Sequence, residues 1–167
     1  MRAFLFLGLI GLLFSGCSNY RLGTGGELSF RTVHIAPVVN ESNLPQAVAI
    51  VSTQLREAFL HDPRVILVNT PEEADAVLSV TLVSYGRDSQ VRQTADTGLT
   101  RKFDVTLNAE VTLRDTGDNK PIFENRKVQA VRQVFVDSGQ LQAEYTAVPL
   151  LAEELAKKVR ASALDIW

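Results

Sequence analysis

Few side chains in this sequence could carry out covalent chemistry. The chain has 167 residues, with one cysteine, Cys17, and two histidines, His34 and His61. His34 falls in an apolar, β-branched stretch typical of a strand. His61 falls at the end of a helical pattern, where a cation favours the helix dipole. Each histidine has a structural explanation, and no Ser-His-Asp set, metal-ligand spacing or phosphate loop can be assembled. We expect a protein that is not an enzyme and has neither a metal site nor a cofactor.

Cys17 follows an apolar segment at the N-terminus. Met1 and Arg2 precede the uninterrupted run AFLFLGLIGLLF, and Ser15-Gly16-Cys17 follows it. The run is too short to span a bilayer as a permanent helix and is typical of a signal peptide. The small residues before the cysteine resemble the bacterial lipobox, although Phe14 stands where leucine is usual. We therefore expect residues 1–16 to be a lipoprotein signal peptide, and Cys17 to carry a diacylglycerol and an N-acyl chain such as palmitate.

The residues after the cysteine predict a location and a domain boundary. Ser18 stands where aspartate would signal inner-membrane retention in enterobacteria, so the pattern resembles that of a protein sent to the outer membrane and held there by its lipid anchor. Residues 17–27 are polar and glycine-rich, which is typical of a flexible tether. Every periodic apolar pattern lies later, so we expect a single domain over residues 28–167. With no second cysteine, the domain can form no internal disulfide.

Charge excludes one class of partner and offers one candidate surface. The net charge of −2 provides no overall basic field for a nucleic acid. Basic side chains gather around the predicted loop and on the strand that returns from it: Arg87, Arg92, Arg101, Lys102, Arg126, Lys127 and Arg132. If these side chains share one face of the sheet, they form a strip that could bind phosphate groups through arginine forks. A solvated surface explains them equally well, because acidic residues lie nearby.

Hydropathy patterns predict the order of the elements. Strands are expected at Thr32–Val39, Arg64–Val68, Ala76–Tyr85, Phe103–Leu113 and Pro121–Val136, with an exposed turn at Pro71–Asp75 and a loop at Asp88–Thr100. A first helix, capped by Ser42 or Asn43, should end near His61, before Pro63. A last helix should bury the stripe Leu141, Tyr145, Val148, Leu151, Leu155 and Val159. Pro149 lies inside that stripe, so the helix either kinks there or begins near Ala147.

These elements predict an α+β fold. Two helices with one apolar stripe each must cover one face of a sheet. The alternation in the Phe103–Leu113 strand is typical of a half-buried antiparallel strand, with Phe103, Val105, Leu107 and Val111 on the core side. We expect a two-layer sandwich with a mixed, mostly antiparallel sheet of four to five strands.

Several of these segments together resemble the lipopolysaccharide-assembly lipoproteins of the LptE family. The likeness covers nearly the whole chain: Gly16-Cys17-Ser18-Asn19-Tyr20-Arg21-Leu22, Val33-His34-Ile35-Ala36-Pro37, Asn40-Glu41-Ser42, Ala74-Asp75-Ala76-Val77-Leu78 and the strand Arg101 to Leu113. The resemblance implies a non-enzymatic plug and assembly factor inside the outer-membrane β-barrel LptD. Such a protein helps to pass lipopolysaccharide to the outer leaflet, and its domain lies on the periplasmic side or in the barrel lumen. The seven basic residues would then contact lipopolysaccharide or the barrel.

Two other functions remain open. Envelope lipoproteins with a similar strand-helix-strand pattern activate a peptidoglycan synthase or build a secretion pore. A lipid carrier with an internal cavity is the third reading, although a small sheet with two helices leaves little room for an acyl chain. Copurification separates the three, because each predicts a different partner: a large barrel, a synthase or pore, or bound lipid alone.

Overall fold

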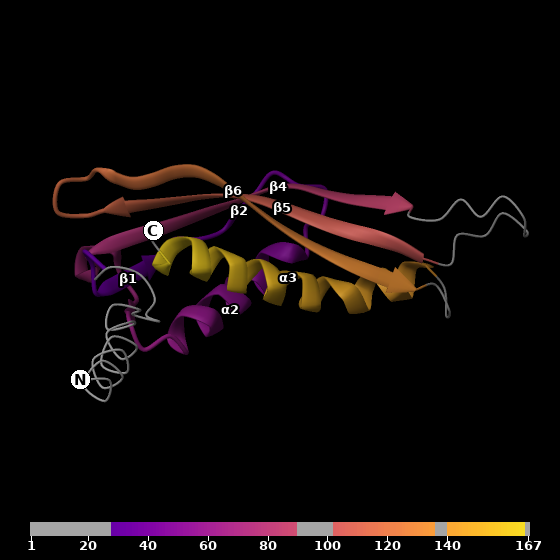
Figure 1. Ribbon diagram of the computed structural model, residues 1–167, viewed down its shortest axis with the longest axis horizontal. Helices are drawn as coiled ribbons and strands as arrows, with labels where there is room; N and C mark the ends of the chain where they lie inside the picture. The colour runs from indigo at the N-terminus through magenta and orange to yellow at the C-terminus, as the bar shows by residue number, and fades with distance from the viewer. Residues whose placement is uncertain (1–27, 90–101, 136–139, 166–167) are drawn as a thin grey trace, which may run out of the picture.

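Two helices cover one face of a single mixed sheet, as Figure 1 shows. The computed structural model describes residues 28–89, 102–135 and 140–165. The strands are β1 (Thr32–Ile35), β2 (Val39–Asn40), β3 (Ile66–Val68), β4 (Ala76–Ser89), β5 (Lys102–Asp115) and β6 (Pro121–Phe135). The helices are α2 (Ala47–Leu60) and α3 (Gln140–Leu164), with a 3₁₀ turn at Pro71–Glu73. The predicted signal peptide, Cys17 and the tether lie outside the described residues.

The sheet confirms the predicted fold class and has slightly more strands than expected. Its six strands run in the order β3-β1-β4-β5-β6, and β2 also pairs with β4. β1 is parallel to β3 and β4, whereas the β4-β5 and β5-β6 pairs are antiparallel. The extra strand arises because the predicted Thr32–Val39 strand is divided. Pro37 has no N–H group to donate to the ladder, so the chain leaves the sheet there and returns as β2.

The hydrophobic core lies between the sheet and the helices. Along β5, alternate residues from Phe103 to Leu113 are buried, which confirms the predicted core side of this strand. On α2 the buried residues are Ala47, Val51, Leu55 and Phe59. On α3 the predicted residues Val148, Leu151, Leu155 and Val159 are all buried. None of the described helices is long and apolar enough to cross a membrane.

The structure corrects the predicted start of the first helix and excludes one of the two alternatives for the last. α2 begins after Gln46, which makes no side-chain cap, so capping by Ser42 or Asn43 is wrong. The Ser42 hydroxyl instead accepts the Leu44 N–H in the preceding turn, at 3.3 Å. α3 is continuous from Gln140 through Pro149, so a start near Ala147 is also wrong. Pro149 is exposed, where water can bond the carbonyl group that the missing N–H leaves free.

Three further boundaries or burial assignments are corrected. Tyr145 is 62% exposed and does not belong to the buried stripe of α3, and Val39 is 54% exposed and is not a buried strand residue. β4 continues to Ser89, past the predicted end at Tyr85, so the predicted loop is wrong at Asp88. The extension is polar and lacks the apolar alternation that the prediction used. It is a strand because its backbone pairs with β5, with a register shift between Leu82 and Ser84.

Candidate functional site

The face of the sheet turned away from the helices is the broadest candidate surface. Because paired residues in an antiparallel sheet share a face, the register with the buried positions of β5 shows which side chains point outward. Many of them on β4, β5 and β6 are neutral and hydrogen-bonding, and they lie among charged residues such as Glu110 and Lys127 and the exposed apolar Val131 and Phe135. We define this open face by Ser79, Thr81, Ser84, Thr106, Asn108, Thr112, Gln129 and Gln133.

A line of hydrogen bonds crosses the open face from strand to strand. Asn108 Nδ2 donates to Ser84 Oγ at 2.9 Å, and Gln129 Nε2 donates to Asn108 Oδ1 at 2.9 Å. Gln133 Nε2 donates to Asp104 Oδ1 at 3.4 Å. These bonds hold the amides of β5 and β6 in place and connect them to the Ser84 hydroxyl of β4. The result is a firm polar surface suited to a wet protein contact rather than to hydrocarbon.

The open face was not predicted as a site from the sequence. The sequence pattern that indicates this face is the series of polar residues that alternate with the buried residues of β5, such as Thr106, Asn108 and Thr112. A polar strand face is the ordinary state of a solvated antiparallel sheet, so composition alone did not distinguish it. The cross-strand bonds, which depend on register, are what single it out.

The predicted basic residues do not form one strip. Of the described members, Arg87, Arg126 and Arg132 lie on the helix side, opposite buried residues of β5, whereas Lys102 and Lys127 lie on the open side. Arg92 and Arg101 lie outside the described residues. The single strip is therefore corrected to two groups on opposite faces of the sheet. Contact of either group with lipopolysaccharide or a barrel stays a prediction.

Two of the helix-side arginines, Arg87 and Arg126, have partners within the protein. Arg87 Nη1 lies 2.6 Å from Glu144 Oε1 on α3. The Arg126 guanidinium donates to the Ser162 carbonyl and lies 3.9 Å above the Phe123 ring. These contacts join α3 to the sheet, so Arg87 and Arg126 have structural roles whatever else they contact.

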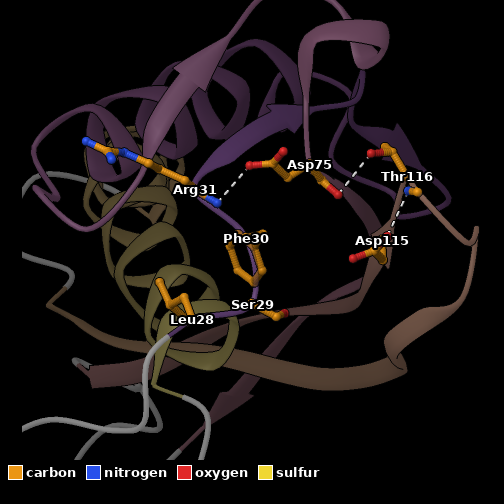
Figure 2. Close-up of a pocket in the computed structure, with 8 residues that line it drawn as sticks. Leu28, Ser29, Phe30, Arg31, Asp75, Asp115 and Thr116 are labelled. Carbon is orange, nitrogen blue, oxygen red and sulfur yellow. Dashed lines mark hydrogen bonds between the residues drawn. The ribbon is translucent and has the colours of Figure 1, made fainter.

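Asp75 joins the beginnings of β1 and β4 to the end of β5, as Figure 2 shows. Its Oδ2 accepts the N–H groups of Thr32 at 2.8 Å and Arg31 at 2.9 Å. Its own carbonyl accepts the Thr116 N–H at 2.9 Å. The two backbone donors, Thr32 first, hold the pKa of the Asp75 carboxyl below its usual range. The Ala74-Asp75 pair, part of the family resemblance, therefore has a structural role, because Asp75 connects the start of β1 to the residue that follows β5.

Two hollows lie on the surface of the described residues. The first has a volume of about 390 Å³ and is lined by Leu28–Arg31, Asp75 and Asp115–Gly117. Figure 2 shows these residues around the hollow. Its carboxylates are engaged with backbone N–H groups, Asp115 Oδ1 accepting that of Gly117 at 2.8 Å. The second, of about 320 Å³, lies between α2 and α3 among charged side chains, including the Glu153–Lys157 ion pair. Most of the side chains that line either hollow are polar or charged, whereas an acyl chain needs a mostly apolar set.

The described residues hold no group of three or more His, Cys, Asp or Glu side chains that could bind a metal ion. His34 Nδ1 lies 3.4 Å from the Val68 carbonyl, and His61 Nδ1 lies 2.8 Å from the Glu57 carbonyl. Each ring therefore has a backbone carbonyl group as a neighbour.

Comparison with known families decides the relationship. The family model described as "LptE: Lipopolysaccharide-assembly" matches residues 30–162. The chain belongs to the LptE family. This confirms the family predicted from the sequence and gives the protein, at family level, a role in lipopolysaccharide assembly. No curated protein sequence matches the chain.

Solved structures share the fold of this LptE-family chain at low sequence identity. A protein from Xanthomonas campestris has a TM-score of 0.57 at 13% identity, covering 83% of this chain and 85% of its own. A minor lipoprotein from Acinetobacter baumannii has a TM-score of 0.52 at 16% identity, covering 81% and 94%. An uncharacterized lipoprotein B from Nitrosomonas europaea has a TM-score of 0.50 at 21% identity, covering 86% and 85%. These likenesses show the fold alone.

Proposed function

We propose that this protein is a non-enzymatic lipoprotein of the outer membrane that acts as a plug and assembly factor in an LptD-like β-barrel and aids the passage of lipopolysaccharide to the outer leaflet. The LptE family model over residues 30–162 is the observation that carries this proposal. Its name gives lipopolysaccharide assembly as the process. The barrel partner and the plug arrangement are what the family resemblance implies.

The open face supports the plug arrangement. The lumen of a large barrel is lined by polar side chains and water, so a plug needs a polar surface that keeps its shape. The hydrogen bonds joining Ser84, Asn108 and Gln129 give the middle of this face such a surface. We place the wall of the barrel against this face.

The lipid anchor on Cys17 has a direct test. The apolar run that ends in Ser15-Gly16-Cys17 predicts cleavage before Cys17 and acylation of its sulfur and amino group. Mass spectrometry of the N-terminal peptide from native membranes should show both additions, because several acyl chains together anchor a protein stably. The Cys17→Ala variant should be recovered either uncleaved or free of the membrane. A mature protein with an unmodified Cys17 would contradict the proposed anchor.

The barrel partner is tested by copurification of the full chain from outer membranes. The parent should recover a large β-barrel protein together with lipopolysaccharide. Asn108→Arg places a charged side chain in the middle of the open face and should reduce barrel recovery by about tenfold, which corresponds to about 1.4 kcal/mol of binding free energy. Thr53→Arg, on the exposed side of α2, is the matched control and should recover the barrel as the parent does.

Each outcome of this copurification distinguishes the proposed function from one of its alternatives. Recovery of a peptidoglycan synthase or a secretion pore in place of the barrel would replace the proposed function with that alternative. Recovery of lipid with no protein would favour a carrier. If Asn108→Arg recovers as much barrel as the parent, the open face is not the contact with the wall. Thermal melting of both variants confirms that any loss of binding does not come from unfolding.

A further inference from the structure

The first part of α3, residues 140–148, lies beyond the reach of α2. Beside the second part of α3, the hollow between the helices is lined by α2 residues such as Gln54 and His61 and by α3 residues such as Glu153 and Arg160. Figure 1 shows that the beginning of α3 extends past α2, beneath the start of β5 and the end of β6. Among the described elements, this part of α3 therefore packs against the sheet without a neighbouring helix.

The first part of α3 covers two apolar side chains of the sheet. Phe103 of β5 and Val134 of β6 lie opposite each other on the helix side, and each is 5% exposed. α3 runs antiparallel to β6, because its last turn contacts Arg126 and an earlier turn contacts Gln129. Its first turns therefore lie against the end of β6, and within the described residues they are what covers this pair.

Small buried side chains and one carboxylate hold the first part of α3 to the sheet. Ala147 and Val148 are buried. The Glu144 side chain is 16% exposed, and its Oε1 lies 2.6 Å from Arg87 Nη1 of β4. The Tyr85 hydroxyl donates to Glu144 Oε2 at 3.5 Å. We call these two contacts of Glu144 the latch. Because half of the Arg87 side chain is exposed, water competes for the ion pair, and the latch can break without disturbing the core.

Pro149 separates the two parts of α3. Proline has no N–H group, so the Tyr145 carbonyl lacks its partner four residues later, and helices bend most readily at such points. Beyond Pro149, the side chains of Leu151, Leu155 and Val159 are each at most 1% exposed and hold the second part on the core. The first part can therefore move while the second part stays packed.

We propose that residues 140–148 form a hinged flap. When the latch breaks, the flap lifts from the sheet about Pro149 as an intact helix, and Phe103 and Val134 become exposed while the rest of the fold stays in place. Local openings of this kind, short of global unfolding, occur in elements with few buried apolar contacts. The flap gives the protein an apolar surface that is present only in the open form. The proposal does not rest on the barrel plug, because it concerns the protein by itself.

Labelling of buried cysteines in the full chain tests the flap. Val134→Cys places a thiol beneath the flap, whereas Ala130→Cys places one on the same strand and face, beneath the second part of α3. Mass spectrometry of the peptide that holds each new cysteine gives its rate of reaction with N-ethylmaleimide, separately from any reaction at Cys17. Glu144→Gln should raise the rate at position 134 about fivefold or more, because it removes the charge of the latch, and should leave the rate at position 130 unchanged.

Two further variants test the hinge and the latch separately. Pro149→Ala should lower the rate at position 134 about threefold, because the restored N–H group bonds the Tyr145 carbonyl and this bond must break before the flap lifts. Glu153→Gln is the matched control for the latch, since it removes the ion pair with Lys157 in the second part of α3. It should leave the rate at position 134 unchanged.

Amide hydrogen exchange distinguishes lifting of the flap from unfolding of the helix end. If the flap lifts as a helix, the Ala147 and Val148 amides stay protected in Glu144→Gln while labelling at position 134 rises. A parallel rise of exchange and labelling would mean that these turns unfold, and would overturn the flap. Equal responses at positions 130 and 134, an unchanged rate in Glu144→Gln, or no decrease in Pro149→Ala would each overturn the proposal as well.

Discussion

Replacing Leu107 with alanine is expected to lower the free energy of unfolding by about 2–5 kcal/mol. Leu107 is 1% exposed on β5, a central strand of the sheet, on the side that packs against the helices. The loss combines the transfer free energy of the removed carbon atoms with a cavity that the strands on both sides cannot close. Urea unfolding of the mature chain, followed by circular dichroism, measures it, provided that the slope with urea is unchanged.

Thr106 provides the matched control, because it neighbours Leu107 on β5 and points to the open face. Its side chain is only partly buried, so Thr106→Ala should cost under about 1 kcal/mol. The contrast between the two variants measures how differently the faces of the sheet are buried in the free protein. Equal losses would mean that the open face is covered, which would contradict its availability to a barrel wall.

The core could be predicted from the sequence because each element repeats its apolar residues with a clear period. The period of two on β5 and the spacing of Val51, Leu55 and Phe59 on α2 each select one face, and burial alone explains both. The ends of strands that are set by hydrogen bonding to a neighbouring strand were harder to predict from the sequence. The polar end of β4 is a strand only because β5 pairs with it, and no local pattern at Asp88 reveals that partner.

The arrangement of the basic residues could not be predicted for a related reason. A shift of one residue in register moves every following side chain to the other face of a sheet. The register of the β5-β6 pair shifts between Val111 and Leu113 of β5. Beyond this shift, Arg126 lies opposite Val111 and points to the helices, whereas Lys127 lies opposite Glu110 and points to the open face. The sequence shows that both are basic and adjacent on a strand, but their faces follow from pairing.

Asp62, a buried carboxylate just after the end of α2, was also not singled out from the sequence. Asp62 is 5% exposed, and its Oδ2 lies 2.8 Å from Arg64 Nη2 and 3.6 Å from Arg160 Nη1. Arg64 Nη1 in turn lies 2.8 Å from Asp165. The cluster thus connects the end of α2 to the end of α3, over a separation in sequence that no local pattern could show.

Asp62→Asn is expected to lower the free energy of unfolding by roughly 1–3 kcal/mol at neutral pH, because it removes a charged hydrogen-bond acceptor from Arg64. The side-chain bond from Arg64 outweighs burial and holds the pKa of Asp62 below its ordinary value of 3.8. The carboxylate therefore stabilises the fold fully above that ordinary value, and its contribution is lost as the pH falls through the lower pKa of the folded state.

The difference between the parent and Asp62→Asn should accordingly be constant from about pH 7 to pH 5 and should shrink below about pH 4. Urea unfolding at a series of pH values measures this difference. Asp118→Asn is a suitable control, because Asp118 pairs with Lys120 at 2.9 Å on the exposed hairpin turn and solvent screens that pair. A difference for Asp62→Asn that stays unchanged down to pH 3 would show that packing of the side chain, rather than its charge, connects the two helix ends.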